Sequence, residues 1–312
     1  MISDRKEIIM TEYVFLNGEY VEADKAVLPV RTHAFLYGTS VFEGIRAYYN
    51  NSQMYIFRMK EHYERLLRSA KIMLMESPYT LEEYCEQTKE LLKRNNYKQD
   101  VYIRPTIYTA SDKISPGLSG TKTGYVLFTT PFGDYYDPSR GLDLCISNWR
   151  RTSDNAIPPR AKIAGAYANA SLINTDAHNC GFDDAIVLSE SGKVTEGSSM
   201  NMMFVRGGKL ITTETTDDIL VGVTRNTVIE LARDLGIEVE VREVDRSELY
   251  IMDEIFVCGT GAQIMPVATI DRRQVGNGKI GEITKKIQKL YFDTVKGNNE
   301  RHKDWCVKVY DD

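Results

Sequence analysis

The sequence predicts an α+β fold divided into two domains. In each half of the chain, strand-like patterns are grouped together and helical patterns stand apart from them, which is typical of α+β proteins rather than of regular βαβ winding. The length of 312 residues fits one large or two medium domains, because single cores tend to split beyond about 250–300 residues. Residues 131–141 contain two prolines and two glycines and are the best linker candidate. We expect a small N-terminal α/β domain at 1–130, a linker at 131–140 and a larger C-terminal domain at 141–312.

Local patterns predict the elements of the first half. Asn17-Gly18 stands between two apolar runs and predicts a β-hairpin, because both residues tolerate positive φ. Apolar residues at helical spacing predict an amphipathic helix over 61–75. Thr80 and Glu83 have the spacing of a capping box, which predicts the start of a second helix. Strands are then expected at 101–108, 125–129 and 142–148.

Similar local patterns predict the helices and strands of the second half. A helix is expected at 168–178 and is stopped by Gly181, and Gly207-Gly208 predicts a second hairpin. Another helix is expected at 224–235 before Gly236. The remaining predictions are strands at 184–188, 238–244 and 254–258 and a C-terminal helix at 281–295.

Composition and charge exclude several classes of protein. The 39 basic and 44 acidic side chains give a net charge of −5, which lacks the basic field of a nucleic-acid-binding protein. The two-residue cluster Arg150-Arg151 is interpreted as a solvated face or a local anion contact. The N-terminus has no signal-peptide pattern, and no apolar run approaches the ~18 residues of a membrane span. The five cysteines are widely spaced without a CxxC pair, which indicates reduced, mostly buried thiols in a cytoplasmic protein.

The common metal and nucleotide motifs are missing from the sequence. Four scattered histidines give no credible metal site, so no metal is expected. The turn Gly259-Thr260-Gly261 follows a predicted strand, but Ile264 stands where a dinucleotide fingerprint needs its last glycine. A glycine-rich turn after a strand still presents free backbone N–H groups, which suits a phosphate.

Two isolated charged residues are the first candidates for a catalytic role. Lys162 is flanked by alanine, isoleucine and glycine, and burial of such a lysine favours the neutral, nucleophilic amine that Schiff-base chemistry needs. The alternative is a surface lysine whose stem lies along apolar side chains. Glu196 stands between small residues, and its alternative is an ordinary acid in a turn. Neither residue decides between these interpretations alone.

A set of segments in one chain order resembles the class IV, or fold type IV, pyridoxal-phosphate (PLP) aminotransferases, and most closely the bacterial branched-chain amino-acid aminotransferases. The resemblance extends from about residue 13 to about residue 295. It implies the two-domain fold of the D-amino-acid aminotransferase type. The segments that carry it are Tyr37–Arg46, Phe57-Arg58, Tyr102–Pro105, Lys162 with Tyr167, Thr195–Gly197, Gly222–Arg225 and Cys258–Gly261.

The resemblance implies a role for each matching residue at the cofactor. Lys162 would bind the cofactor aldehyde covalently and then move a proton as a base. Glu196 would face the pyridine nitrogen and Tyr167 would hydrogen-bond the phenolic oxygen. Arg58 would pair with the phosphate, and Leu220 would pack on the ring unless it is a plain core leucine. Backbone and hydroxyl groups would complete the phosphate site at Val223, Thr224 and Thr260.

The same resemblance implies a substrate pocket and a reaction. Amino acids and 2-oxo acids would be the small-molecule partners, with leucine, isoleucine or valine as donor and 2-oxoglutarate as acceptor. Gly261 and Ala262 would offer backbone N–H groups to the substrate carboxylate. Arg104 would orient that carboxylate or accept the acidic side chain of glutamate, unless it forms a buried ion pair with Glu43. The pocket would be formed by Tyr37, Phe42, Gly44, Tyr102, Arg104 and Tyr135.

The sequence also departs from the family pattern. Phe132 stands where branched-chain enzymes often have tryptophan, and Gly261 where they often have alanine; the loop 111–123 lacks the usual Gly-Val element. These departures concern the preferred amino acid and not the cofactor chemistry. Three other functions also stay open: a class IV transaminase for D-amino acids or (R)-amines, an aminodeoxychorismate lyase, and a non-catalytic scaffold. The resemblance further implies a homodimer or a larger assembly of dimers.

Overall fold

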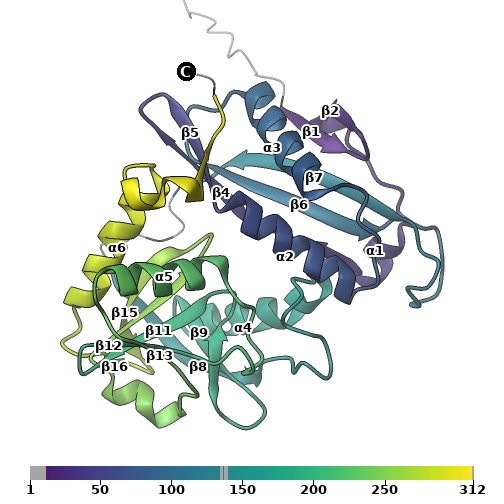
Figure 1. Ribbon diagram of the computed structural model, residues 1–312. Coiled ribbons are helices and arrows are strands. Elements are labelled where there is room, and N and C mark those ends of the chain that lie inside the picture. The colour runs from purple at the N-terminus through teal and green to yellow at the C-terminus, as the bar shows by residue number, and fades with distance from the viewer. Residues whose placement is uncertain (1–11, 134–135, 137–139, 311–312) are drawn as a thin grey trace, which may run out of the picture.

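The computed structural model describes residues 12–133, 136 and 140–310. It contains two β-sheets, each covered by helices, which form the two parts of the chain in Figure 1. The first sheet, in the upper part of Figure 1, has the order β17-β5-β4-β6-β7-β1-β2, with β3 also paired to β6. Its strands are β1 (Tyr13–Leu16), β2 (Glu19–Glu22), β3 (Ser40–Phe42), β4 (Ile45–Asn50), β5 (Gln53–Phe57), β6 (Val101–Thr109), β7 (Thr123–Pro131) and β17 (Cys306–Lys308).

Helices α2 (Met59–Ile72) and α3 (Leu81–Asn95) pack on one face of the first sheet. Leu66 of α2 and Leu91 of α3 are fully buried against strand residues such as Ile103. This burial is the main contribution of an amphipathic helix to stability, at about 25 cal/mol per Å² of apolar surface. The short helix α1 (His33–Tyr37) precedes β3.

The second sheet, in the lower part of Figure 1, has the order β10-β9-β8-β15-β14-β11-β12-β13, with β16 paired to β15. Helix α4 (Tyr167–Asn179) packs through Ile173 on β9, whereas α5 (Val223–Asp234) and α6 (Glu282–Val295) pack together on β14. The strands are β8 (Leu142–Arg150), β9 (Asp184–Leu188), β10 (Val194–Gly197), β11 (Asn201–Arg206), β12 (Lys209–Thr212), β13 (Val239–Val241), β14 (Glu254–Gly259), β15 (Gln263–Ile270) and β16 (Arg273–Gln274).

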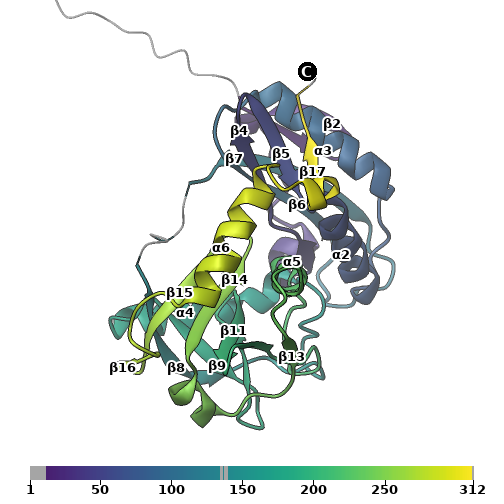
Figure 2. The ribbon, with the colours of Figure 1, turned by 60° about the vertical axis from the view of Figure 1, so that its left-hand side comes forward.

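The end of the chain returns to the first sheet. After α6, β17 pairs antiparallel with β5, placing Cys306 opposite Phe57. Figure 2 shows α6 running from the second sheet towards this strand. Residues 306–308 therefore belong to the first sheet although they lie at the far end of the chain; the domain boundaries given above stay a prediction.

Most predicted elements are present with ends shifted by one to three residues. The prediction of an α+β fold is confirmed. The hairpin β1–β2 turns at Asn17-Gly18, whose φ values of 50° and 110° explain the choice of residues. Helix α2 begins at Met59 instead of residue 61, and Leu74 beyond its end has a φ of 54°. The expected strand at 238–244 is shorter, because only Val239–Val241 pair with β12 at the edge of the sheet.

Two of the elements that the sequence did not predict were missed for identifiable reasons. The hairpin β4–β5 turns at Asn51-Ser52, both at positive φ, and without glycine this turn gives a weak sequence signal. Strand β15 contains Pro266, which argues against a strand with partners on both sides. The cysteines also differ in part from expectation: Cys258 is buried and Cys180 is exposed, with the other three half-buried and all five free.

The capping box at the start of α3 is formed as the sequence predicts. Thr80 Oγ1 accepts from Glu83 N at 3.3 Å, and Glu83 Oε2 accepts from Thr80 N at 2.7 Å. Thr80→Ala is expected to lower the free energy of unfolding by about 1 kcal/mol, because one amide of the first turn loses its acceptor. Urea unfolding measures this, with exposed Lys71→Ala on α2 as the control. Equal stabilities of wild type and Thr80→Ala would contradict the capping role.

Candidate active site

One cavity of about 370 Å³ is lined by residues of both halves of the chain. This is within the range typical of small-molecule sites. The first half contributes the turn after β3 and residues of β6. The second half contributes the segment that leads into α4, the strand β10, the N-terminus of α5 and the turn between β14 and β15. Most of the predicted site residues line its wall: Lys162, Tyr167, Glu196, Leu220, Val223, Thr224, Thr260, Phe42, Gly44, Tyr102, Arg104, Gly261 and Ala262.

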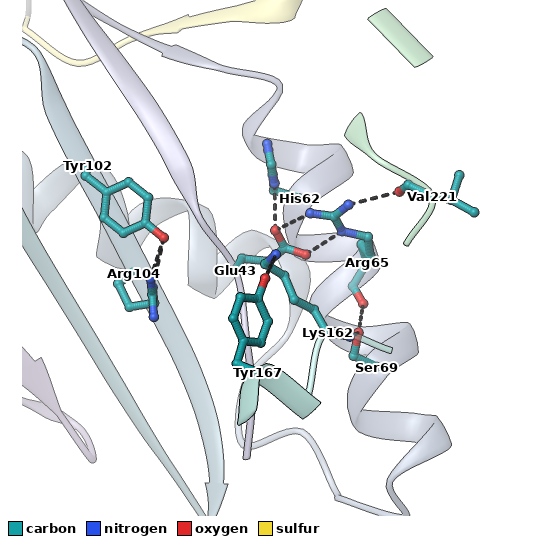
Figure 3. Close-up of polar contacts among 9 residues, drawn as sticks. All are labelled: Glu43, His62, Arg65, Ser69, Tyr102, Arg104, Lys162, Tyr167 and Val221. Atoms are coloured by element: carbon teal, nitrogen blue, oxygen red, sulfur yellow. Dashed lines mark hydrogen bonds and ion pairs between the residues drawn. The ribbon is translucent and has the colours of Figure 1, made fainter. Parts of the chain in front are cut away.

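Lys162 is half-buried, and its amine donates a hydrogen bond to Tyr167 Oη at 2.5 Å. Figure 3 shows the lysine side chain directed towards the tyrosine ring. Tyr167 is the first residue of α4, five positions after the lysine, and the 3₁₀ turn Ala164–Ala166 separates the lysine from this helix. The interpretation of Lys162 as an exposed surface lysine is therefore wrong.

The backbone around Lys162 is fixed by contacts with the first half. Phe42 N donates to Lys162 O at 3.0 Å, and Lys162 N donates to Ser69 Oγ at 3.1 Å. Two glycines allow this close approach, since a Cβ on Gly38 would lie 2.9 Å from Gly165 Cα. Gly38 also has a φ of 68°, which favours glycine. A larger residue at either position would push the lysine segment away from β3.

Glu196 lies in β10 and is buried, so it is not an acid in an exposed turn. Its carboxylate forms an ion pair with Arg151 at 2.8 Å and accepts from Asn201 Nδ2 at 3.0 Å and from Leu220 N at 3.3 Å. Burial raises the pKa of Glu196, although Arg151 and Lys162 act in the opposite direction. The result is a carboxyl group of increased basicity facing the cavity.

The N-terminus of α5 forms another part of the cavity wall. Gly222 is the N-cap and provides no side-chain cap, so the first amides of the helix are open to a ligand. A Cβ on Gly222 would lie 2.0 Å from Asn201 Oδ1, which requires glycine here. With the turn at 259–262, these amides form a site suited to an anion, because helix N-termini carry partial positive charge.

Arg58 does not line the cavity in this structure. Its guanidinium pairs with Glu61 at 2.6 Å and Glu230 at 2.9 Å, and it stacks on Trp305 with 3.5 Å between its Cζ and the ring centroid. The expected phosphate contact of Arg58 therefore stays a prediction without support from this geometry.

The predicted substrate residues come together in part. Arg104 donates to Tyr102 Oη from Nε at 3.0 Å and from Nη2 at 2.7 Å, and its Cζ lies 4.3 Å from the centroid of the Phe42 ring. A Cβ on Gly44 would lie 2.5 Å from Tyr102 Oη, so glycine leaves room for this phenol. Tyr37 is outside the cavity wall and 37% exposed. Tyr135 lies outside the described residues.

The suggested ion pair between Arg104 and Glu43 is wrong. Glu43 is fully buried and pairs instead with Arg65 at 2.6 Å and with His62 at 2.7 Å, as Figure 3 shows. Within the part of the chain that the structure describes, no carboxylate lies within ion-pair distance of Arg104. Its charge is therefore available to a ligand in the cavity.

Three contributors to the site were missed from the sequence. Arg151 was assigned to a surface pair of arginines, and its position directly after the end of β8 gives no local sign that it meets Glu196. Arg65 lines the cavity from α2, and only its spacing on the buried face of that helix could have indicated it. Asn201 follows the glutamate by five residues and lies at the start of β11.

Two other features, a metal site and a membrane-spanning helix, are absent from the described residues. No group of three or more histidine, cysteine, aspartate or glutamate side chains in residues 12–133, 136 and 140–310 could hold a metal ion. None of the helices in those residues is both long and apolar enough to cross a membrane.

Comparisons with known proteins agree with this geometry. The family model for amino-transferase class IV matches residues 40–270. A probable branched-chain-amino-acid aminotransferase of Aquifex aeolicus is 45% identical over 303 residues, covering 96% of this chain and 97% of the relative. The crystal structure of the branched-chain aminotransferase from Thermoproteus uzoniensis with norvaline is 40% identical, with a TM-score of 0.93 over 96% of this chain and all of the other.

A second solved structure carries the cofactor in its name. It is the branched-chain amino acid aminotransferase from Thermobaculum terrenum in its PLP form, 38% identical with a TM-score of 0.92 over 96% of this chain and 99% of the other. The family model spans more than half of the chain, and the Aquifex relative matches it over nearly its whole length. The chain therefore belongs to the class IV aminotransferases.

Proposed function

We propose that the chain transfers the amino group of the branched-chain L-amino acids leucine, isoleucine and valine to 2-oxoglutarate, giving branched 2-oxo acids and L-glutamate. The observation that carries this proposal is the pair of Lys162 and Tyr167 in a cavity that also contains Glu196 and the start of α5. The names of the relatives and structural neighbours support the substrate class.

The donor set of the cavity fits PLP. This cofactor has an aldehyde, a phenolic oxygen, a pyridine nitrogen and a phosphate. The cavity provides an amine at Lys162, a hydroxyl at Tyr167 and a carboxyl at Glu196, and the uncapped amides of α5 provide an anion site. Asn201 and Arg151 hold the carboxyl group in place. We infer that Lys162, Tyr167, Glu196, Leu220, Val223, Thr224 and Thr260 hold the cofactor.

PLP, when bound, withdraws electrons from the substrate Cα and so makes its proton acidic. Lys162 is the base for that proton, since it is the amine in the cavity wall. The hydrogen bond to Tyr167 Oη limits the rotation of the lysine side chain and so directs the amine. A base that is held in this way would accept the proton from Cα and pass it to the cofactor carbon that carried the aldehyde, without a search over rotamers.

Glu196 keeps a proton at the pyridine nitrogen. Burial raises the pKa of Glu196, but the charges of Arg151 and Lys162 act in the opposite direction and favour the carboxylate, which is the form that would stabilise a protonated nitrogen. The ion pair with Arg151 fixes the orientation of the carboxylate. The carboxyl group therefore has a defined direction and a cation beside it.

Arg104 explains how one pocket can accept two unlike side chains. The rings of Phe42 and Tyr102 offer an apolar wall to leucine, while the Arg104 guanidinium lies against the same rings. A glutamate side chain would find a cation there without a competing carboxylate among the described residues. We infer that Phe42, Gly44, Tyr102 and Arg104 contact the substrate, with Gly261 and Ala262 at its carboxylate.

We also propose that the protein is a cytoplasmic homodimer. Among the described residues, Val27, Val30 and Phe35 lie close in sequence and are each at least 74% exposed. A group of large exposed apolar side chains indicates a protein contact surface. Analytical ultracentrifugation of the active protein checks this: a dimer is expected, and an active monomer would refute it.

The role of Glu196 predicts a defined loss in one variant. Glu196→Gln keeps the shape of the side chain but cannot hold the pyridine proton by charge. Losing about 1.5 kcal/mol of charge-assisted hydrogen bonding predicts a kcat about tenfold lower with the cofactor still bound. Single-turnover kinetics on variant loaded with PLP measures this, and exposed Glu82→Gln on α3 is the control. Unchanged turnover would show that Glu196 has only a structural role.

A panel of amino donors tests the proposed function. L-Leucine, L-isoleucine and L-valine are expected to give glutamate from 2-oxoglutarate at similar rates, in an assay coupled to glutamate dehydrogenase. Turnover of D-alanine or an (R)-amine without turnover of L-leucine would instead favour the other class IV transaminases. Release of pyruvate from aminodeoxychorismate without glutamate formation would favour the lyase.

A further inference from the structure

A buried ion pair outside the proposed chemistry connects the two halves of the chain at the cavity. Glu43 lies in the turn between β3 and β4 and is 0% exposed. Arg65, on the buried face of α2, donates from Nε to Glu43 Oε1 at 2.6 Å and from Nη2 to Oε2 at 2.8 Å. Figure 3 shows this two-point contact. It fixes the plane of the guanidinium as well as its position.

His62 adds a third contact to the same carboxylate. Its Nδ1 lies 2.7 Å from Glu43 Oε2. Burial lowers the pKa of His62, so the imidazole is neutral and donates its Nδ1–H. Burial alone would raise the pKa of Glu43, but Arg65 and His62 outweigh it and lower the pKa to about 2. Glu43 is therefore charged, and Arg65 is the cation that balances it.

The remaining terminal nitrogen of Arg65 reaches the second half of the chain. Arg65 Nη1 donates to Val221 O at 2.9 Å. The preceding residue is held on both sides, since Leu220 N donates to Glu196 and Leu220 O accepts from Asn201 Nδ2 at 2.9 Å. This loop leads directly through Gly222 into the first turn of α5. Arg65 thus determines where that turn begins relative to α2.

The backbone of Lys162 is attached to the same ion pair from the other side. Ser69 Oγ accepts from Lys162 N and donates to Arg65 O at 2.9 Å. Phe42, the neighbour of Glu43, donates its N–H to Lys162 O. The residues that flank the ion pair on β3 and on α2 therefore hold the lysine, while the guanidinium of Arg65 holds the loop before α5.

We propose that Arg65, held in plane by Glu43, is a positioning residue that sets the place of the Lys162 segment relative to the first turn of α5. The inference rests on the proposed function in that both elements must act on one bound cofactor. If the ion pair of Arg65 and Glu43 only stabilised the fold, the two hydrogen bonds between them would be sufficient. The third hydrogen bond, from Arg65 to Val221 O, would not be needed. Lysine cannot replace arginine here, because an ammonium group lacks the planar set of donors.

The test compares Arg65→Lys with Arg68→Lys in the full-length protein. Arg68 lies on the same helix, 64% exposed and with its Nη1 4.0 Å from Glu64 Oε2, so its replacement is the matched control. Hydrogen–deuterium exchange is expected to speed up in Arg65→Lys at peptides covering 219–226, with α3 unchanged. A displacement of about 1 Å costs about 10²-fold in rate, so kcat with L-leucine and 2-oxoglutarate should fall to that extent with little change in KM. Arg68→Lys should match the wild type in both measurements.

The exchange measurement separates the inference from the proposed function. If the unmutated protein does not transaminate, the proposed function fails, while exchange at 219–226 still tests the positioning of the loop. Unchanged exchange at 219–226 in a folded Arg65→Lys variant would overturn the inference. Faster exchange over the whole protein, with a loss in kcat equal to the fraction of unfolded protein, would also overturn it, because it would show a loss of stability only.

Ser69→Ala provides the second variant if Arg65→Lys does not fold. It removes the acceptor of Lys162 N with a change of one atom. Faster exchange at 160–167 and a lower kcat, with the melting temperature kept, are expected. Wild-type exchange and kcat in Ser69→Ala would overturn the coupling between α2 and the lysine.

Discussion

Lys162→Ala is expected to abolish transamination while the fold remains. The variant loses the amine that binds the cofactor and the base that moves the proton at Cα. General acid–base catalysis alone contributes about 10²–10⁴-fold, so the loss should be at least of this size. The side chain is only half-buried and its backbone contacts with Phe42 and Ser69 do not depend on the amine. Single-turnover rates and circular dichroism of the same preparation measure both parts.

Two controls make this result specific. Lys286→Ala removes an exposed lysine of α6 and should leave activity unchanged. A small primary amine added to Lys162→Ala should restore part of the proton transfer, because it can occupy the place of the lost side chain. Near wild-type turnover in Lys162→Ala would remove Lys162 from the mechanism.

Arg104→Leu is expected to separate the two half-reactions. If the guanidinium accepts the acidic side chain of glutamate, the variant loses a charge-assisted hydrogen bond of about 1.5–3 kcal/mol on that substrate alone. This predicts a loss of roughly 10- to 150-fold in the glutamate half-reaction and a much smaller loss with leucine. Stopped-flow rates of each half-reaction measure the difference, and a melting curve of the variant accounts for stability.

Tyr102→Phe is the control for Arg104→Leu. It removes the hydroxyl that accepts from Arg104 but keeps the charge and the ring. A loss in Arg104→Leu that greatly exceeds the loss in Tyr102→Phe would assign the effect to the charge. Equal losses on glutamate and leucine in Arg104→Leu would contradict the dual-specificity role and favour a contact with the carboxylate that both substrates share.

Local patterns were sufficient for much of the fold. Asn17-Gly18 and the Thr80–Glu83 capping box act within a few residues, so their outcome depends little on the rest of the chain. Strand β15 was missed because it contains Pro266. This proline is paired with Phe256 of β14 and the pairing with β8 begins only at Val267, so its tolerance depends on the tertiary register of the sheet. The return of β17 to the first sheet could not be predicted either, since three residues carry no pattern.

The candidate site also contains features that the sequence indicates and contacts that only the tertiary structure determines. Lys162 and Tyr167 were found through the resemblance to the class IV aminotransferases, and the structure brings them together at the start of α4. The partners of the charged groups were not found, because Arg151 and Glu196 are 45 positions apart (196 − 151) and meet only through the pairing of β8, β9 and β10. Glu43 shows why the partner of a buried charge is hard to predict. The sequence suggested Arg104, whereas the packing of α2 on the first sheet places Arg65 beside Glu43.

The measurement that tests the central claim most directly is the absorbance of the purified, PLP-loaded protein during the first half-reaction. Addition of L-leucine without an acceptor is expected to replace the pyridoxal absorbance by that of pyridoxamine phosphate, and 2-oxoglutarate is expected to restore it. Because each step uses one substrate, this shows cofactor, donor and acceptor separately. A spectrum that L-leucine leaves unchanged while another amine converts it would contradict the proposed branched-chain transamination.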